Sequence, residues 1–252
     1  MDLDTGGNIQ YLRSKLLQDE GFTHAFFNKF SNLKRPEVLI KCFSDEHSLH
    51  STRQVHGTKI VEASQASKSF KPECDGLISN KKNQSLWIYT SDCIPLLFAD
   101  KVSRKVAAVH VGWRGLSEKI IFKVIKKLTK SNCNIDSLIV SIGPAISQSN
   151  YEVNLPVASK IYHSLELRKK RQENNFVRIK ELLISHEIAS KHEEKDKLYV
   201  DIRSAANKQL INSGLNQLQI SINDDCTYSN THQFNSWRRT NEKKLQWSFI
   251  MT

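Results

Sequence analysis

Short apolar runs separated by polar turns dominate the middle of the chain, and this pattern predicts strands. Three such runs follow one another at residues 86–89, 94–99 and 106–111, and we expect them to form the centre of a sheet. The polar stretch 100–105 predicts a hairpin between the last two runs. Further strands are predicted at 138–142 and 218–222, and a last apolar run occupies 247–251.

A different periodicity follows the central runs and predicts helices. Apolar residues at 120, 121, 124, 125 and 128 recur with the spacing of one buried helical face, while lysines fill the opposite face. We expect this helix to begin at Ser117 and Glu118. Residues 156–166 and 175–195 are helical by composition. Residues 201–212 predict a helix with Asp201 as its N-cap and Gly214 after its end.

The first 50 residues carry the weakest pattern. They predict a short helix near 11–17 and a strand at 38–43. Residues 53–62 alternate like a strand that is interrupted at Gly57, so His56 is expected at a bulge or a strand end. Residues 75–80 predict a turn that enters a short strand.

Composition bounds the class of protein. The 252 residues, with 39% hydrophobic and 25% charged content, can bury a substantial core, and we expect one domain over 1–252. Five cysteines, far apart in the sequence, favour free thiols in a reducing compartment. No basic leader is present, and no apolar run reaches the roughly 18 residues of a membrane helix. We therefore expect a cytoplasmic protein without a membrane partner.

The positive charge of the chain indicates which partners it can bind. A formal net charge of +11 and a pI of about 9.4 suit an anionic partner. The charge is diffuse, however, and its densest run, 168–171, has no interleaved aromatic residues. A solvated surface explains that run better than a nucleic-acid site does, whereas a nucleotide or nucleoside phosphate stays compatible with the charge.

Two histidines and one cysteine are the candidate reactive residues. Cys93 follows the first central run, His110 lies near the end of the third, and His56 precedes Gly57. Two imidazoles and a thiolate suit Zn or Cu, and three protein ligands leave a fourth position open for water or substrate. The same residues fit a thiol hydrolase with Cys93 as nucleophile and one histidine as base. The alternative is that Cys93 is a small buried residue and the histidines are structural.

Two further features adjoin this set. Residues 112–115 lead into the predicted helix, whose free amides, together with Arg114, are suited to hold an anion. Cys226 stands between Asp225 and Thr227 and either lines the site or is structural.

Six ordered blocks between residues 53 and 240 resemble the YfiH family, also called laccase-domain or polyphenol oxidoreductase proteins and related to the human protein FAMIN. The blocks are QVHG at 54–57, DGL at 75–77, SDCIP at 91–95, HVGWRG at 110–115, GPAI at 143–146, and CT at 226–227 with SWRR at 236–239. Ser91 and Val111 replace the usual alanines. A Gly-Gly-x-Ser element is missing around 26–33, and no Gly-Arg follows Arg239. We therefore regard residues 1–50 as divergent.

The resemblance implies a structure and a function. It implies a single-domain, layered mixed-sheet α/β (α+β) fold like that of the cytotoxic necrotizing factor catalytic domain. It makes His56, Cys93 and His110 the zinc-binding catalytic residues. The implied reactions are phosphorolysis of adenosine, inosine, guanosine and methylthioadenosine, and deamination of adenosine, so the partners would be a purine nucleoside and phosphate. Bacterial members are also linked to editing of peptidoglycan precursors.

Four residues outside the triplet are expected to bind substrate. In phosphorolysis, Arg114 and the helix amides would hold phosphate near the ribose C1′. In deamination, a carboxylate such as Asp92 would move protons next to a metal-activated water, although Asp92 also suits a turn or capping role. Arg238 and Arg239 either bind phosphate or pair with surface carboxylates.

Three other functions compete with a zinc-dependent nucleoside enzyme. One is a cysteine hydrolase or amidase acting on a cell-wall precursor, and another is a copper-dependent polyphenol oxidoreductase. True multicopper chemistry needs many histidines, commonly in His-x-His pairs, and this chain has nine histidines and no such pair. The last is a basic module that binds nucleic acid or a protein partner without catalysis, which predicts salt-dependent binding.

Overall fold

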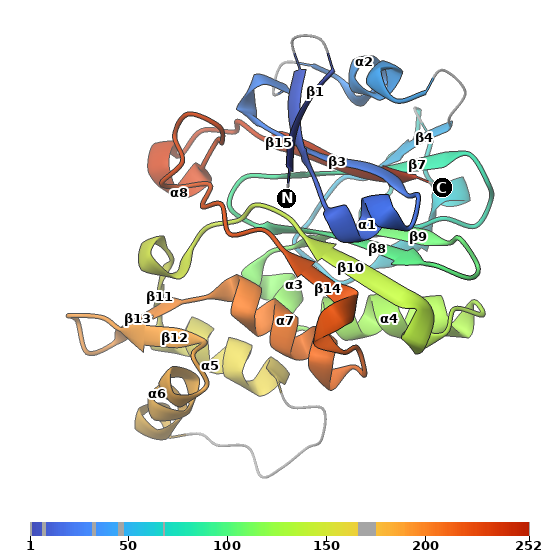
Figure 1. Cartoon of the computed structure of the whole chain (residues 1–252). Coiled ribbons are helices and arrows are strands. Elements are labelled where there is room, and N and C mark those ends of the chain that lie inside the picture. Colours follow the sequence, from blue (N-terminus) through green and yellow to red (C-terminus); the bar gives the residue numbers. More distant parts are fainter. Residues whose placement is uncertain are drawn as a thin grey trace.

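The computed structural model describes residues 2–6, 9–31, 34–44, 48–67, 69–165 and 175–251, and there the strands form two six-stranded sheets and one three-stranded sheet (Figure 1). The first sheet has the order β1 (Asp2–Gly6), β2 (Ile9–Arg13), β3 (Thr23–Phe27), β15 (Gln246–Met251), β7 (Gln84–Thr90), β4 (Ser48–Ser51). The second has the order β14 (Ile220–Ile222), β10 (Leu138–Ile142), β8 (Ile94–Asp100), β9 (Val106–Val111), β6 (Gly76–Ile78), β5 (Ile60–Glu62).

The small sheet and the helices between residues 113 and 212 lie on one side of the second sheet (Figure 1). The small sheet has the order β11 (Glu152–Asn154), β13 (Lys197–Val200), β12 (Ala189–Lys191). The α-helices of the described residues are α1 (Lys15–Asp19), α2 (Pro36–Leu39), α3 (Trp113–Ser117), α4 (Ile120–Lys130), α5 (Leu155–Leu165), α6 (Phe176–Ser185), α7 (Ile202–Asn212) and α8 (Trp237–Thr240).

Period-two alternation along β9 divides its side chains between two cores. Ala107 and Val109 belong to the core between the second sheet and the helices. Val106 and Ala108 belong to the core between the two sheets, where they meet side chains of the first sheet such as Leu86. The domain therefore has a sheet, sheet and helix layering. The outer face of the first sheet carries a third, aromatic cluster that includes the stacked pair Trp87 and Phe249.

The layered mixed-sheet α/β fold is confirmed, and so are several predicted elements. β8 and β9 form an antiparallel pair at the centre of the second sheet. Helices α5 and α7 occupy the predicted segments. The Asp201 carboxylate caps α7 by accepting from the backbone N–H groups of Arg203 and Ser204, and Gly214 follows the helix with φ of +106°.

The prediction that three apolar runs share one sheet was wrong. The first run is part of β7, which lies in the first sheet between β15 and β4. The chain crosses from one sheet to the other at residues 91–93. β7 and β8 are both buried on both faces, so their apolar sequences do not reveal which sheet each strand joins.

Several local predictions also need correction. Residues 38–43 form helical turns, because Pro36 favours the first turn of a helix at the start of α2. Residues 11–17 are split between β2 and α1, and the predicted helix 175–195 ends at Ser185 before β12. The predicted helix start at Ser117 is instead the end of α3, and Lys119, with φ of 62°, separates α3 from α4. The strand predicted at 53–62 contains only β5 and a bridge at Arg53.

Within the described residues, every helix is too short or too polar to cross a bilayer.

Candidate functional site

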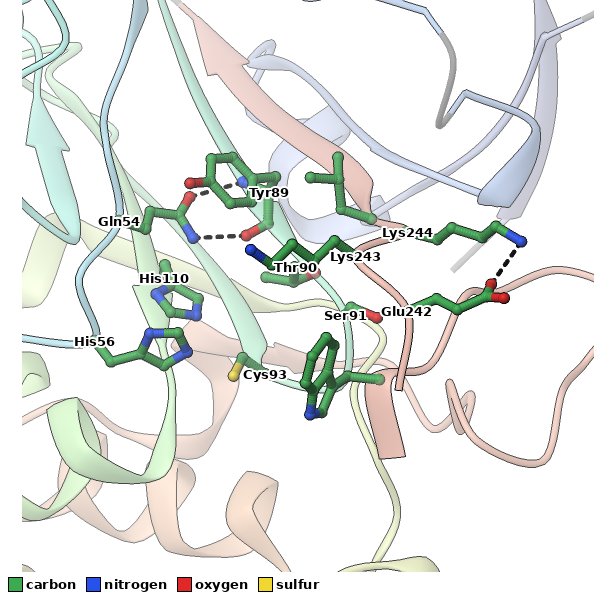
Figure 2. A pocket seen from close by; sticks show the side chains of 12 residues that line it. Gln54, His56, Tyr89, Thr90, Ser91, Cys93, His110, Glu242, Lys243 and Lys244 are labelled. Atoms are coloured by element: carbon green, nitrogen blue, oxygen red, sulfur yellow. Dashed lines mark hydrogen bonds and ion pairs between the residues drawn. The ribbon is translucent and has the colours of Figure 1, made fainter. Parts of the chain in front are cut away.

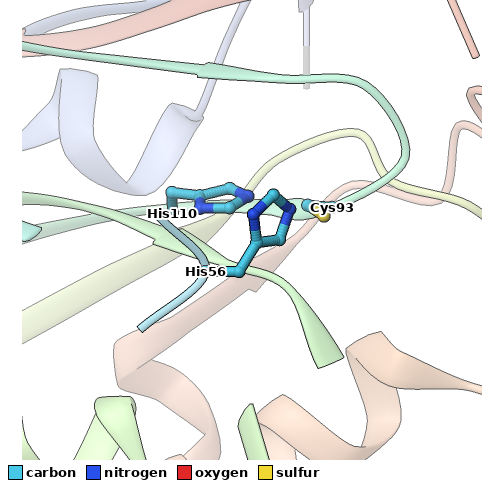
Figure 3. Close-up of side chains that lie close together, drawn as sticks. All are labelled: His56, Cys93 and His110. Atoms are coloured by element: carbon cyan, nitrogen blue, oxygen red, sulfur yellow. The ribbon is translucent and has the colours of Figure 1, made fainter. Parts of the chain in front are cut away.

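Three segments distant in sequence bring His56, Cys93 and His110 together at one end of the sheet sandwich (Figure 2). One nitrogen of each imidazole and the Cys93 Sγ all lie within 4.8 Å of one another. The two imidazole rings meet edge to face, with centroids 4.8 Å apart and an angle of 87° between their planes (Figure 3). The geometry therefore joins the three residues that the sequence singles out.

The parity of β9 decides where His110 points. His110 shares its face of the strand with Val106 and Ala108, so it faces the first sheet rather than the helices. The side chain is 3% exposed. A shift of one residue in this strand would turn the imidazole into the helical core.

A buried carboxylate outside the predicted set of reactive residues fixes both histidines. Asp75, which precedes β6, accepts backbone N–H groups from Val55 at 3.3 Å, His56 at 2.9 Å and Gly57 at 2.7 Å. Its Oδ1 also lies 2.8 Å from Nδ1 of His110. The carboxylate therefore holds the His56 loop in place and leaves Nε2 of His110 to face Cys93.

The His56 loop and the Cys93 turn both need special backbone. His56 has φ of 58° and Asp92 has φ of 82°, in the left-handed region that non-glycine residues rarely adopt. Gly112 supplies the space between the loop and the turn. A Cβ atom at Gly112 would lie 2.8 Å from Cδ2 of His56 and 3.2 Å from Sγ of Cys93.

Electrostatics favour a thiolate next to an imidazolium. Burial alone would raise the pKa of the Cys93 thiol, but the charge of His110 and hydrogen bonds from His110 and His56 outweigh burial and lower that pKa to about 6. Burial alone would lower the pKa of His110, but the Cys93 charge and the Asp75 hydrogen bond raise it to about 9. The two groups stabilise each other in charged form, so Cys93 carries the ionised form that metals and electrophiles require.

A pocket of about 580 Å³ opens over the cluster, which suits a small organic ligand (Figure 2). Its walls come from the His56 loop, the end of β7, the Cys93 turn and the segment between α8 and β15. The lining residues are Gln54, His56, Tyr89, Thr90, Ser91, Cys93, His110, Trp237, Glu242, Lys243, Lys244 and Leu245. Aromatic rings and cations thus adjoin the reactive cluster.

Asp92 does not line this pocket, and its side chain bonds to other parts of the protein. Its carboxylate accepts from Oγ1 of Thr227 at 2.6 Å, Oγ of Ser236 at 3.0 Å and the backbone N–H of Arg238 at 2.7 Å. Asp92 is 7% exposed. These contacts correspond to the turn and capping role, and the expected role of Asp92 toward the substrate remains a prediction.

Arg239 also stabilises the protein rather than facing the pocket. Its guanidinium donates to the backbone carbonyl groups of Thr227 at 2.9 Å and Phe234 at 2.7 Å, and also to that of Tyr228. Five donors arranged in a fork fit several carbonyl acceptors at once. These contacts give Arg239 a structural role in the C-terminal loop, and its expected phosphate contact remains a prediction.

Arg114 and Arg238 stay accessible but lie outside the pocket lining. The Arg114 guanidinium lies 4.5 Å from the ring centroid of Trp113, and that of Arg238 lies 5.1 Å from the centroid of Tyr151. Arg238 also donates to the carbonyl oxygen of Glu152 through both terminal nitrogens, each at 3.1 Å. Helix α3 has five residues, so residues 112–115 begin a shorter helix than the sequence predicted. Substrate binding by these two arginines remains a prediction.

Cys226 likewise lies outside the pocket lining. Its Sγ accepts backbone N–H groups from Ser147 at 3.3 Å and Ser229 at 3.4 Å. Burial opposes ionisation, but these hydrogen bonds outweigh it and lower the pKa of Cys226 to about 7. The thiol holds two loops together, which is the structural alternative.

The sequence pattern did not point to three residues that build the site. Besides Asp75, it missed Gln54, whose amide donates to the Tyr89 carbonyl at 2.7 Å and accepts the Tyr89 N–H at 2.9 Å, so that it ties the His56 loop to β7. It also missed Lys243 in the pocket wall. Gln54 and Asp75 fall inside the motif blocks, which was a usable signal, whereas Lys243 lies in a polar stretch without any pattern.

The donor set fits a bound transition metal. Two imidazole nitrogens and a thiolate match the ligands that Zn²⁺ and Cu ions accept, and the pocket leaves room for a further ligand. The Asp75 contact to Nδ1 of His110 is the usual support of a metal-binding histidine. Among the described residues this is the one group of three or more potential ligands close enough to share an ion.

Fold and site together define a single-domain α/β protein with a candidate His-Cys-His metal centre. The family model described as multi-copper polyphenol oxidoreductase laccase matches residues 32–252, so the chain belongs to this family. It is 32% identical to the purine nucleoside phosphorylase slr1573 of Synechocystis, over 96% of this chain and 93% of that protein. It is 27% identical to the purine nucleoside phosphorylase YfiH of Escherichia coli, over 78% of this chain and 71% of that protein.

Solved structures support the fold. YlmD from Geobacillus stearothermophilus matches with a TM-score of 0.80 at 18% identity, covering 98% of this chain and 97% of that one. The Bacillus licheniformis protein YfiH matches with a TM-score of 0.78 at 20% identity, covering 96% of both chains. The family model and the sequence relatives confirm the expected relationship to the YfiH family, and the solved structures show the shared fold.

Proposed function

We propose that this protein is a metal-dependent purine nucleoside phosphorylase, that zinc is its metal, and that His56, Cys93 and His110 are its catalytic ligands. The observation that carries the proposal is the clustering of these three side chains within 4.8 Å beneath an open pocket. The Synechocystis relative, similar over nearly the whole of both chains, supports the reaction class. A bound zinc ion would supply Lewis-acid activation of an oxygen ligand at the open position.

In the proposed reaction, a phosphate oxygen forms a bond to the ribose C1′ while the bond from C1′ to N9 of the purine breaks. The purine leaves with the bonding electron pair and takes up a proton, so the products are the free base and ribose 1-phosphate, or 5-methylthioribose 1-phosphate when methylthioadenosine is the substrate. Tyr89 and Trp237 provide aromatic surface for a base in the pocket, and Trp237 is 45% exposed there. Asp75 fixes the orientation of His110, and Gln54 fixes the loop that carries His56.

We expect adenosine, inosine, guanosine and methylthioadenosine to serve as substrates, and deamination of adenosine is a second reaction to test. Because the Asp92 carboxylate accepts three protein hydrogen bonds, we do not assign it the proton transfer in deamination. We also propose a cytoplasmic location, because the candidate site needs a reduced cysteine.

The test is a product assay with purified protein of measured metal content. The protein is incubated with each purine nucleoside and phosphate, and free base, ribose 1-phosphate and inosine are quantified by chromatography. We expect phosphate-dependent release of base that is lost on chelation and restored by zinc. Absence of turnover across all purine nucleosides in zinc-loaded protein would refute the proposal.

A second candidate, a cysteine hydrolase, is favoured by one observation. Cys93, His110 and Asp75 form a chain of contacts that resembles a thiolate, imidazole and carboxylate triad. This reading predicts amide hydrolysis that survives chelation and is abolished by alkylation of Cys93. Loss of all activity on chelation would argue against it. The copper-dependent oxidase is tested in parallel with a phenol substrate and copper-loaded protein.

A further inference from the structure

We propose that Lys243 is the residue that binds the phosphate co-substrate in the pocket. This inference rests on the proposed phosphorolysis, which requires a phosphate anion beside the nucleoside. The Lys243 side chain lines the same cavity as the His56, Cys93 and His110 cluster. The arginines expected to hold phosphate are committed elsewhere or lie outside the lining.

The direction of two neighbouring lysines separates their roles. Figure 2 shows the Lys243 side chain running back across the pocket toward Tyr89 and Thr90, whereas Lys244 runs the opposite way toward Glu242. The Lys244 ammonium pairs with the Glu242 carboxylate at 2.6 Å. Across the described part of the chain, the Lys243 ammonium has no hydrogen bond or ion pair. Its charge is thus available to a ligand, while that of Lys244 is already paired.

The backbone on either side of Lys243 is held in place. Asn241, with φ of 55°, ends α8 and donates its N–H to the Trp237 carbonyl at 2.7 Å. On the other side, Gln246 begins β15 opposite Thr90, and its side chain accepts from the N–H of Asn235 at 3.0 Å. A short segment anchored at both ends presents the lysine at a defined place in the wall.

Charge favours phosphate, and not the nucleoside, as the partner of the Lys243 ammonium. The purine and the ribose are uncharged, and aromatic side chains are available for the base. The phosphate is the one anionic reactant, and a lysine ammonium offers it a charge-assisted hydrogen bond. A 5′-phosphate on a nucleotide has the same chemistry, so the test must separate the two sources.

The test measures binding and turnover in Lys243→Ala and in the matched control Lys244→Ala. We expect Lys243→Ala to raise the KM for phosphate by roughly 10-fold to 100-fold, the usual effect of losing a charge-assisted hydrogen bond, and to leave the KM for nucleoside within about threefold. Lys244→Ala should raise the phosphate KM clearly less than Lys243→Ala does, because its ammonium is already paired with Glu242, and Lys243→Arg should retain most of the phosphate affinity. An unchanged phosphate KM in Lys243→Ala, or an equal rise in Lys244→Ala, would overturn the inference.

Calorimetric titration without nucleoside keeps this inference distinct from the proposed function. Inorganic phosphate is titrated into the wild-type protein and both alanine variants, and AMP and adenosine are titrated separately. Weaker phosphate binding in Lys243→Ala alone supports the inference even if no phosphorolysis is measured. Phosphate affinity equal in wild type and Lys243→Ala, or a loss confined to AMP, contradicts it even if phosphorolysis is established.

Discussion

Two buried carboxylates flank the candidate site, and they differ in what they hold. Asp75 is fully buried and joins the His56 loop to the imidazole of His110. Asp92 is almost as buried, but it joins the Cys93 turn to Thr227, Ser236 and the start of α8. Asp75 therefore connects the reactive groups to each other, whereas Asp92 connects the site to the C-terminal loop.

Burial and hydrogen bonding therefore do not by themselves identify a carboxylate that affects activity or metal binding. Both carboxylates accept at least three hydrogen bonds, so removing the charge of either should destabilise the fold. Only Asp75 touches an imidazole of the cluster. The contact to His110, rather than the depth of burial, should decide which substitution alters activity and metal binding.

The largest effect should come from removing a member of the cluster itself. We expect Cys93→Ser to lower kcat/KM for phosphorolysis by about 10³-fold or more and to release most of the bound metal, because it removes the thiolate ligand. Activity assays and elemental analysis of the purified protein measure both. Cys226→Ser is the matched control, since it removes another thiol of lowered pKa outside the pocket, and it should keep its metal. Full metal content and activity in Cys93→Ser would contradict the metal site.

Substitution of the two carboxylates tests the comparison directly. Asp75→Asn should lower activity or metal affinity by about 10-fold to 100-fold, because the partner that orients His110 becomes a neutral amide. Asp92→Asn should change activity by less than about threefold. Urea denaturation should show a loss of about 1–3 kcal/mol in the free energy of unfolding for both variants.

The stability measurement separates a positioning effect from general damage to the fold. If Asp92→Asn lowers activity as much as Asp75→Asn at equal stability, the distinction between the two regions fails. An Asp75→Glu variant adds a second check, because it keeps the charge but displaces the carboxylate. We expect it to bind metal better than Asp75→Asn, which a merely structural role for Asp75 would not require.

The sequence singled out His56, Cys93 and His110, which the structure brings together, but it did not single out the residues that hold them in place. His56, Cys93 and His110 could be selected because thiol and imidazole are few in the chain and stand at the ends of apolar runs. Asp75 and Asp92 have the same sequence context, a polar residue next to a buried strand, and only the packing of the sheets reveals which one meets His110.

The sequence predicted elements that have local signals, and it failed for features that depend on contacts between distant segments. The capped helix α7 carries its own start and end signals, so its bounds were predictable. The membership of β7 in the first sheet depends on pairing with β15, some 160 residues away in sequence, and no local signal encodes it. Lys243 was missed for the same reason, because the wall that it enters exists only once β15 pairs with β7.

A smaller effect is expected at Gly112, where the His56 loop approaches the Cys93 turn. Because a Cβ atom there would lie 2.8 Å from the His56 ring, Gly112→Ala should displace His56 and lower activity by about tenfold. Kinetic assays and metal titration measure the change. Gly214→Ala is the control: its φ of +106° makes it cost about 1 kcal/mol of stability, but it lies after α7 and should leave activity unchanged. Normal metal affinity in Gly112→Ala would show that the contact is unimportant.

The smallest effect, and the sharpest on the Asp75 side of the comparison, concerns thiol ionisation in metal-free protein. Only the thiolate is alkylated, and the pKa of Cys93 is about 6, so its alkylation by iodoacetamide should be half-maximal near pH 6 and fall as the pH falls below that value. Peptide mass spectrometry after short incubations resolves Cys93 from Cys226, whose midpoint should lie near pH 7.

Asp75→Asn should shift the Cys93 midpoint upward. Without the Asp75 carboxylate the pKa of His110 falls, the imidazolium is less populated, and the thiolate of Cys93 loses part of its stabilisation. The alkylation rate at pH 6 should drop by roughly twofold to fivefold, while the Cys226 midpoint stays fixed. Asp92→Asn should leave both midpoints unchanged. A downward shift in Asp75→Asn, or an equal upward shift in Asp92→Asn, would mean that charge reaches Cys93 by a route other than the contact between Asp75 and His110.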